Sequence, residues 1–347
     1  MNYSKRVLIV ATSRKTRGGI TAVIKAHEQG KQWDEFKCNW IETHIDRSNF
    51  LKIFYFIKAI IKFIFLAPFY DIIHIHIASF PSYKRKIFFF NIAKIYRKKI
   101  ILHFHPHKPE VIFDEKNKKF YKNIFLRSDK ILVLSNQWKN WIYEALGVYE
   151  NIEVLYNPCP KIPLFTKDDS RKFILFAGTI YKRKGYDHLI QAFAKIAKKF
   201  PDWSVVLAGN GEIEKGELLS EKLNIERQIR FVGWVDGLDK HELFKNASIF
   251  CLASSAEGFP MAVLDAWSYG LPVICTPVGG LVDIVEDKVS ALIFDYGDIE
   301  NLAIKLELFI TDIQIREEIA KKSFGLSKTT FNVDNINIQL KNIYNSI

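Results

Sequence analysis

Cysteine is scarce in this sequence, and its spacing excludes whole classes of site. The chain of 347 residues has four cysteines, and no two of them form a C-x-x-C pair. They are Cys38, Cys159, Cys251 and Cys275. Isolated cysteines in apolar or turn segments are typical of reduced, structural thiols, so we expect no disulfide framework.

Two other signals are missing. The N-terminus leads directly into the apolar segment KRVLIV without a signal peptide, which predicts a cytoplasmic protein. A DNA- or RNA-binding signature, such as basic residues interleaved with aromatic ones, is also absent. A basic nucleic-acid-binding protein therefore stays an alternative with no motif in its support, and we expect no nucleic-acid partner.

Charge is unevenly distributed along the chain. Residues 1–165 contain 28 Lys and Arg against 13 Asp and Glu, a net charge of +15, although the total for the chain is +12. The remaining residues have 22 basic and 25 acidic side chains, a net charge of −3. A basic half favours an anionic partner: nucleic acid, an anionic membrane surface or an acidic substrate.

Strand-like and helix-like segments alternate along the whole chain. Apolar runs such as Val7–Ala11, Lys130–Ser135 and Phe173–Ala177 are each followed by a loop or short connection and a helical pattern. This alternation predicts parallel sheets with helices on both faces. Two domains are expected at this length, and the proline-rich segment VLYNPCPKIPLF is the natural linker. We place the domains at residues 1–165 and 166–330.

The segment from Ser254 to Gly280 has the most informative pattern: SSAEGFPMAVLDAWSYGLPVICTPVGG. The apolar run SIFCLA before it predicts a buried strand, Pro260 suits the first turn of a helix, and Gly270 is placed to end that helix. We expect the N-terminal N–H groups of this helix to point out of the carboxyl edge of a parallel sheet. Such a position suits an anion such as a diphosphate.

Two acids flank this anion site. Glu257 lies in the loop before the helix, and Asp265 lies within the helix. Carboxylates are poor ligands for phosphate, but they accept hydrogen bonds from sugar hydroxyls. The segment therefore suits a nucleotide sugar, a group that is both phosphate and polyol. An ordinary strand–turn–helix connection with no ligand is the alternative, because a motif is a hypothesis until its context agrees.

The pattern E-G-F-P-x-x-x-x-D-A, followed by G-L-P-V-I-x-T-x-V-G-G, resembles the donor-binding segment of retaining glycosyltransferases of family 4. These enzymes have the GT-B fold, an α/β fold of two Rossmann-like domains facing across a cleft. The resemblance implies that Glu257 contacts the donor sugar and Asp265 the nucleotide ribose. The family usually has Glu where this chain has Asp265, so the contact with the ribose would come from a side chain that is one methylene shorter. Gly258, Phe259, Pro260 and Met261 would hold the sugar-phosphate, with backbone amides at Phe259 to Met261.

The same resemblance assigns roles elsewhere in the chain. Gly18 and Gly19, after the first strand, match a Gly-Gly loop that lies against the donor diphosphate. His105, at the end of the segment IILHFH, matches a histidine that meets the donor sugar, with His107 as a competitor.

The loop Gly178–Gly185 matches the family pattern G-R-x-x-x-x-K-G in part. Lys184 matches the lysine, whereas Thr179 replaces the arginine, and Arg183 or Lys182 is placed to substitute for it. Cations at this position would stabilise the charge of a departing nucleoside diphosphate. A solvated run of charges is the alternative interpretation.

No metal is predicted. The sequence has no D-x-D tripeptide that could hold a metal-bound diphosphate, so lysines and helix amides would meet the diphosphate instead. The histidines of two strand-like segments, among them His74, His76 and His103, could be interpreted as a zinc site. Their i, i+2 spacing along strands, with no cysteine or paired carboxylate, does not complete a tetrahedron.

The most apolar segment is NFLKIFYFIKAIIKFIFLAPF, residues 49–69. Lys52, Lys58 and Lys62 argue against a membrane span, since each central Lys costs about 2.5–3.5 kcal/mol. In a helix the three lysines gather on about one third of the circumference. The helix either packs against the sheet with its lysines reaching water or lies in a membrane interface, and the pattern alone does not decide.

The resemblance, taken with the missing D-x-D tripeptide, implies a metal-independent retaining glycosyltransferase of the hexosyltransferase type, with a UDP-sugar favoured over a GDP-sugar as donor and no cofactor. The resemblance implies that residues 1–165 bind the acceptor, that 166–330 bind the nucleotide sugar, and that residues 331–347 form a helix crossing back to the first domain. The basic half favours a lipid-linked saccharide acceptor at the inner face of the plasma membrane, in capsule, O-antigen or exopolysaccharide synthesis. A nucleotide-sugar epimerase of the same fold is the alternative.

Overall fold

The computed structural model describes residues 5–166 and 171–347, which form two compact units. Unit 1 contains the described residues up to Pro158 together with Val333–Ile347, and unit 2 is formed by those of Cys159–Asn332. The sequence analysis places the boundaries after residues 165 and 330. The first boundary lies earlier because the N–H of Cys159 already donates to the carbonyl of Phe331, 2.8 Å away in unit 2.

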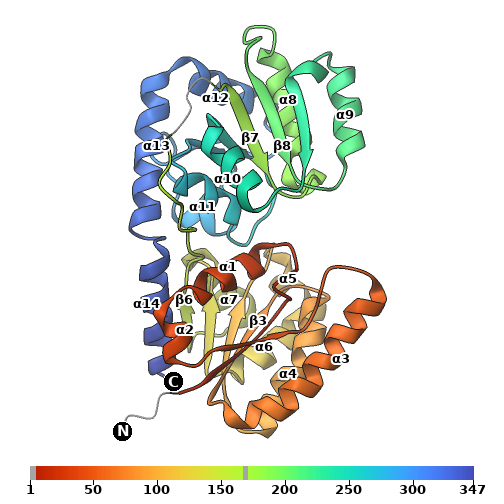
Figure 1. The fold of residues 1–347 in the computed structure, drawn as a ribbon, viewed down its shortest axis with the longest axis vertical. Coiled ribbons are helices and arrows are strands. Elements are labelled where there is room, and N and C mark those ends of the chain that lie inside the picture. The colour runs from red at the N-terminus through yellow and green to blue at the C-terminus, as the bar shows by residue number, and fades with distance from the viewer. Residues whose placement is uncertain (1–4, 167–170) are drawn as a thin grey trace. The chain divides into compact units, whose positions relative to one another are not determined.

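Unit 1 is built on a six-stranded sheet in the order β2-β1-β3-β4-β5-β6, with every neighbouring pair parallel. Helices lie on both sides of this sheet (Figure 1), which explains why its strands are continuous apolar runs. The strands are β1 (Val7–Ala11), β2 (Asn39–Glu42), β3 (Ile72–Ile77), β4 (Lys99–Phe104), β5 (Lys130–Val133) and β6 (Ile152–Val154).

The helices of unit 1 come from both ends of the chain. They are α1 (Gly19–Glu28), α2 (Lys31–Glu35), α3 (Asn49–Leu66), α4 (Ser82–Ile95), α5 (Glu110–Phe113), α6 (Glu115–Leu126), α7 (Asn136–Leu146) and the C-terminal α14 (Val333–Asn345), with a 3₁₀ turn η1 at Ala67–Phe69. Helix α14 packs against α1 and α2, and its Ile336, Leu340 and Tyr344 join a core cluster with Val7 and Ile9 of β1.

Unit 2 contains a second parallel six-stranded sheet, in the order β12-β11-β10-β7-β8-β9. Counted within the unit this order is 6-5-4-1-2-3, the order of Rossmann dinucleotide-binding sheets. The order reverses between β7 and β10, and ligands bind beyond the carboxyl ends of the strands at such a switch point. The strands are β7 (Phe173–Ala177), β8 (Ser204–Ala208), β9 (Ile229–Gly233), β10 (Ile249–Leu252), β11 (Val273–Cys275) and β12 (Leu292–Ile293).

Helices also lie on both faces of the second sheet (Figure 1). They are α8 (Tyr186–Ile196), α9 (Ile213–Lys222), α10 (Gly237–Asn246), α11 (Met261–Ser268), α12 (Ile299–Thr311) and α13 (Ile313–Lys328), with 3₁₀ turns η2 (Lys182–Lys184), η3 (Glu226–Gln228) and η4 (Gly279–Asp283). The two sheets confirm the predicted fold class, α/β with two Rossmann-like domains.

The apolar segment at residues 49–69 forms α3 and the turn η1. Within α3 only Ala59 and Phe63 are buried, so a narrow face of the helix accounts for its packing against the rest of unit 1. Of the helices in the described ranges, none combines the length and apolar character needed to cross a membrane.

Candidate functional site

The loops after β7 and β10 bring a predicted acid and a predicted cation together at the switch point of unit 2. Lys184, at the end of η2, places its Nζ 2.5 Å from Oε1 of Glu257. The hydroxyl of Ser254 donates to the same oxygen at 2.7 Å. Glu257 is only 7% exposed. Its carboxylate is therefore held in one orientation by two donors, and an ammonium group lies directly beside it.

Two glycines allow the backbone to approach this closely. Gly185 has a φ of +68°, and a Cβ there would lie 2.0 Å from the carbonyl oxygen of Ala253. Gly279 has a φ of +57°, and its Cβ would lie 2.1 Å from the carbonyl oxygen of Glu257. A side chain at either position would displace the loop that carries the acid. Gly279 belongs to the sequence motif G-L-P-V-I-x-T-x-V-G-G, but the motif alone predicts no role for it.

Helix α11 begins directly after the loop of Glu257. Pro260 is its N-cap residue, one position before the first helical turn where the sequence analysis places it. No side chain caps the helix, and its first turn from Met261 contains no acidic residue. The first N–H groups of α11 thus have no capping side chain, as an anion-binding helix start requires. Gly258 accepts a hydrogen bond from the N–H of Gly280 at 2.8 Å, and Phe259 packs on Phe331.

Asp265 lies in α11 and is paired with a lysine that the sequence analysis does not single out. Nζ of Lys240, from α10, is 2.7 Å from Oδ2 of Asp265. Burial raises the pKa of the Asp265 carboxyl above its usual value, although the neighbouring ammonium group favours the charged form. A ligand hydroxyl at this carboxylate would share it with Lys240.

Two other residues of the loop after β7, Arg183 and Thr179, form hydrogen bonds that do not involve Glu257 itself. The guanidinium of Arg183 donates to the carbonyl of Ala256 at 2.5 Å, and the carbonyl of Arg183 accepts from the N–H of Ser255 at 2.8 Å. Arg183 thus braces the loop that carries Glu257. Thr179 is exposed, and its carbonyl accepts from the N–H of Tyr181.

In unit 1 the glycine pair lies where the sequence predicts it, between β1 and α1. Gly18 is the N-cap residue with a φ of +140°, and Gly19 begins the helix. Here too no side chain caps the helix, and the first turn has no acidic residue. The positive φ explains the need for glycine at position 18.

His105 follows β4 at the carboxyl edge of the unit 1 sheet. Its N–H donates to the carbonyl of Ile77 at 2.7 Å, and its Nε2 lies 2.9 Å from Nδ1 of His76. Burial lowers the pKa of His105 to about 3, so the ring is neutral at pH 7. His107, the competitor, pairs instead with Oγ of Ser79 at 2.9 Å.

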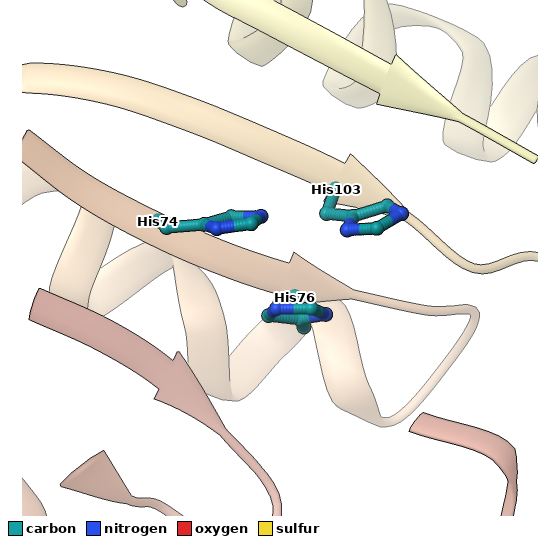
Figure 2. Close-up of side chains that lie close together, drawn as sticks. All are labelled: His74, His76 and His103. Atoms are coloured by element: carbon teal, nitrogen blue, oxygen red, sulfur yellow. The ribbon is translucent and has the colours of Figure 1, made fainter. Parts of the chain in front are cut away.

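Three further histidines lie close together on β3 and β4 (Figure 2). Ring nitrogens of His74, His76 and His103 lie within 4.8 Å of one another, and all three side chains are buried. The rings of His74 and His76 are 4.5 Å apart at 23°, and those of His74 and His103 are 5.5 Å apart at 13°. Near-parallel rings direct their lone pairs side by side, whereas a zinc ion needs ligand nitrogens at about 2.0–2.1 Å around one point. The arrangement favours stacking, and the absence of a metal stays a prediction.

Comparison with known proteins shows what unit 2 is similar to. Residues 162–324 match the family model described as "Glycosyl transferases group 1". The chain is 30% identical over 207 residues to an "Uncharacterized glycosyltransferase" of Haemophilus influenzae, a match that covers 58% of this chain and 57% of the relative. It is 28% identical over 171 residues to the "Capsular polysaccharide biosynthesis glycosyltransferase CapM" of Staphylococcus aureus, covering 49% and 45%. The chain thus spans about half the length of the curated relatives it matches.

A solved structure shares the fold along the whole chain. HepE from Anabaena, in complex with UDP-glucose, superposes with a TM-score of 0.82 over 99% of this chain and all of that one. The sequence identity is 20%, so this likeness shows the fold alone. The matches confirm the predicted resemblance to glycosyltransferases of the GT-B fold. The retaining class and the roles of single residues stay predictions.

Proposed function

We propose that the protein moves a sugar from a nucleotide-sugar donor to a saccharide acceptor, because residues 162–324 match the family model of glycosyl transferases group 1. Unit 2 binds the donor and unit 1 the acceptor. A UDP-sugar is the favoured donor, and the complex of HepE with UDP-glucose supports this choice. The reaction belongs to the synthesis of a surface polysaccharide such as capsule or O-antigen, which the match to CapM supports.

The observation that carries the proposal is the pair of Glu257 and Lys184 at the β7/β10 switch point, beside the uncapped start of α11. Free helix N–H groups and an ammonium group stabilise the negative charge that a departing diphosphate develops. The buried carboxylate of Glu257 accepts hydrogen bonds from sugar hydroxyls. Lysine and backbone amides take the part that a metal ion has in other transferases, so the proposed transfer needs no metal and no cofactor.

Retention at the anomeric carbon completes the proposal. The acceptor hydroxyl attacks from the face on which the diphosphate leaves, and a diphosphate oxygen takes its proton. Glu257 and His105 position the sugar, Gly18, Gly19 and the start of α11 meet the diphosphate, and Asp265 with Lys240 meets the ribose. Because Arg183 braces the loop of Glu257, Lys184 is the principal cation.

The proposed acceptor is lipid-linked and lies at the inner face of the plasma membrane. The net charge of +15 in residues 1–165 supports this, since polybasic surfaces gain about 1 kcal/mol per Lys or Arg near anionic lipid. The exposed apolar side chains of α3 support it as well.

Thermal unfolding with a panel of nucleotides tests the donor site. UDP is expected to raise the melting temperature, and a UDP-sugar to raise it further. Glu257→Ala should keep the shift with UDP and lose the additional shift from the sugar, whereas Glu221→Gln, an exposed acid of α9, should keep both.

No stabilisation by any nucleotide would overturn the donor assignment. If the donor is instead isomerised with no acceptor present, the epimerase alternative is correct.

A further inference from the structure

Unit 1 contains a pocket of about 220 Å³ between the carboxyl end of β2 and helix α3. Trp40 and Glu42 line it from β2, Arg14 lines it from the loop after β1, and Tyr55, Lys58 and Lys62 line it from α3. The roles proposed above for the glycine pair and His105 do not involve it. Its position at the carboxyl ends of parallel strands is one where α/β sheets bind ligands.

The charges in this pocket do not balance. The guanidinium of Arg14 stacks on Trp40 and forms ion pairs with Glu28 and Glu42, so its charge is compensated within the protein. Lys58 and Lys62 are exposed, and neither has an ion pair within the ranges that the structure describes. One turn apart on α3, they place two uncompensated ammonium groups on the same wall of the pocket.

Helix α3 also has an unusual outer surface. Seven large apolar side chains of this helix are each at least 40% exposed, and at 100° per residue they fall within an arc of about 120°. They are Phe50, Ile53, Phe54, Ile57, Ile61, Ile64 and Phe65, which we call the α3 stripe. The buried Ala59 and Phe63 lie on the opposite side of the helix, and Lys58 and Lys62 lie between these two faces.

The exposed apolar surface continues onto the neighbouring helix. Phe88 of α4 is 51% exposed and packs edge-on against Phe56 of α3, with ring centroids 5.6 Å apart. Figure 1 shows α3 and α4 side by side at the edge of unit 1. A contiguous exposed apolar patch marks a site of interaction with a protein or a membrane, and a border of lysines is typical of a helix that lies in a membrane interface.

We propose that the pocket between β2 and α3 binds the phosphate of a membrane lipid while the α3 stripe lies in the acyl boundary of the same bilayer. The ligand must carry an anion next to a hydrocarbon, because the two free ammonium groups directly border the apolar stripe. A nucleic acid supplies the anion but nothing to cover the stripe. The inference deepens the proposed function: the phosphate would be that of the lipid carrying the acceptor, which places the acceptor on unit 1.

Vesicle binding by the full chain tests the site with three compositions: phosphatidylcholine alone, with phosphatidic acid, and with oleic acid at the same surface charge. Binding should be strongest with phosphatidic acid. Lys58→Ala/Lys62→Ala should lower that binding about tenfold or more, because each lysine near an anionic surface is worth about 1 kcal/mol. The control Lys116→Ala/Lys119→Ala removes the same charge from exposed positions of α6, a helix that does not line the pocket, and should therefore lower binding much less than the double substitution on α3.

Two results would overturn the inference. One is an equal loss in both double variants, which shows general electrostatic attraction; the other is equal binding to phosphatidic and oleic acid, which shows that phosphate is not recognised. Ile57→Asp, in the middle of the stripe, should weaken binding to all three vesicles; unchanged binding would also overturn the inference and would favour a protein partner for the stripe. Stabilisation by UDP is measured on the same variants, so the donor site and the lipid site can fail separately.

Discussion

At the scale of single residues, the histidines of unit 1 form a network of neutral rings. Burial lowers the pKa of His76 well below its usual value and that of His105 to about 3. Each ring therefore carries one proton at neutral pH, and the 2.9 Å bond between Nδ1 of His76 and Nε2 of His105 has one donor. The tautomer of His76 fixes that of His105, so His76 is a positioning residue for it.

This hydrogen bond gives a prediction for the proposed transfer reaction. His76→Leu removes it and should lower kcat by about tenfold, because small displacements of positioned groups cost that much or more. His76→Asn offers an amide near the position of Nδ1 and should recover most of the activity. Stabilisation by UDP should stay unchanged in both variants. Equal kcat values for the two variants would show that the ring only fills space.

Local motifs identify some site residues and miss others. Glu257 and Lys184 lie in loops with recognisable patterns, and the structure brings them together because β7 and β10 are neighbours at the switch point. Lys240 was missed because its contact with Asp265 spans 25 residues and depends on how α10 packs. His76 was considered as a strand residue and as a candidate zinc ligand, and its hydrogen bond was missed because its partner His105 is 29 residues away.

At the scale of elements, the turn from η2 into α8 depends on a glycine in close contact. Gly185→Ala should destabilise unit 2 more than Gly237→Ala, which has a similar φ of +54° but open space around an added Cβ. The control variant Gly237→Ala should lose about 1–2 kcal/mol of unfolding free energy, because alanine is strained in the left-handed conformation. Contact with the carbonyl of Ala253 should add roughly 1–3 kcal/mol in Gly185→Ala. Urea unfolding measures both, and equal losses would contradict the close contact.

The sequence predicts those elements best that are buried on both sides. The strands β1 and β7 have the bounds expected from their apolar runs. The short strand β2 was missed because its four residues, two of them half-buried, give no apolar run. The segment assigned as linker starts at Val154, the last residue of β6, and continues with the buried Leu155, which bonds to the carbonyl of Val133. The start of this segment is therefore extended along the sheet because it pairs with β5, which lies outside the segment.

At the scale of the whole molecule, unit 1 should be sensitive to mild acid. Burial lowers the pKa of His27 to about 4, and it also depresses the pKa values of His74, His76 and His103. Below pH 6.5 these histidines become protonated in the unfolded chain but stay neutral in the native cluster. The stability present above pH 6.5 is therefore lost as the pH falls, by roughly 1.4 kcal/mol per pH unit for each histidine.

Urea unfolding between about pH 7 and about pH 5 measures this slope. Within the part of the chain that the structure describes, neither ring nitrogen of His103 has a hydrogen-bond partner. His103→Leu should therefore cost little free energy of unfolding at pH 7. It should also lower the number of protons taken up on unfolding, which the slope reports, by about one. The matched control is His188→Gln, which removes a histidine from unit 2 and leaves the cluster in unit 1 intact. A slope of zero in the parent protein would contradict the burial of these rings as neutral groups.

The position of α14 has a consequence for how the protein is made. Asn337 accepts from the buried His27, and the hydroxyl of Tyr344 pairs with His74 at 2.7 Å, so the core of unit 1 is complete only with the last residues of the chain. At about 5–20 residues per second, a ribosome needs roughly ten to forty seconds to pass through unit 2 before it reaches α14. The domain made first therefore lacks part of its core while the second domain is synthesised, and its core is complete only once α14 has been made.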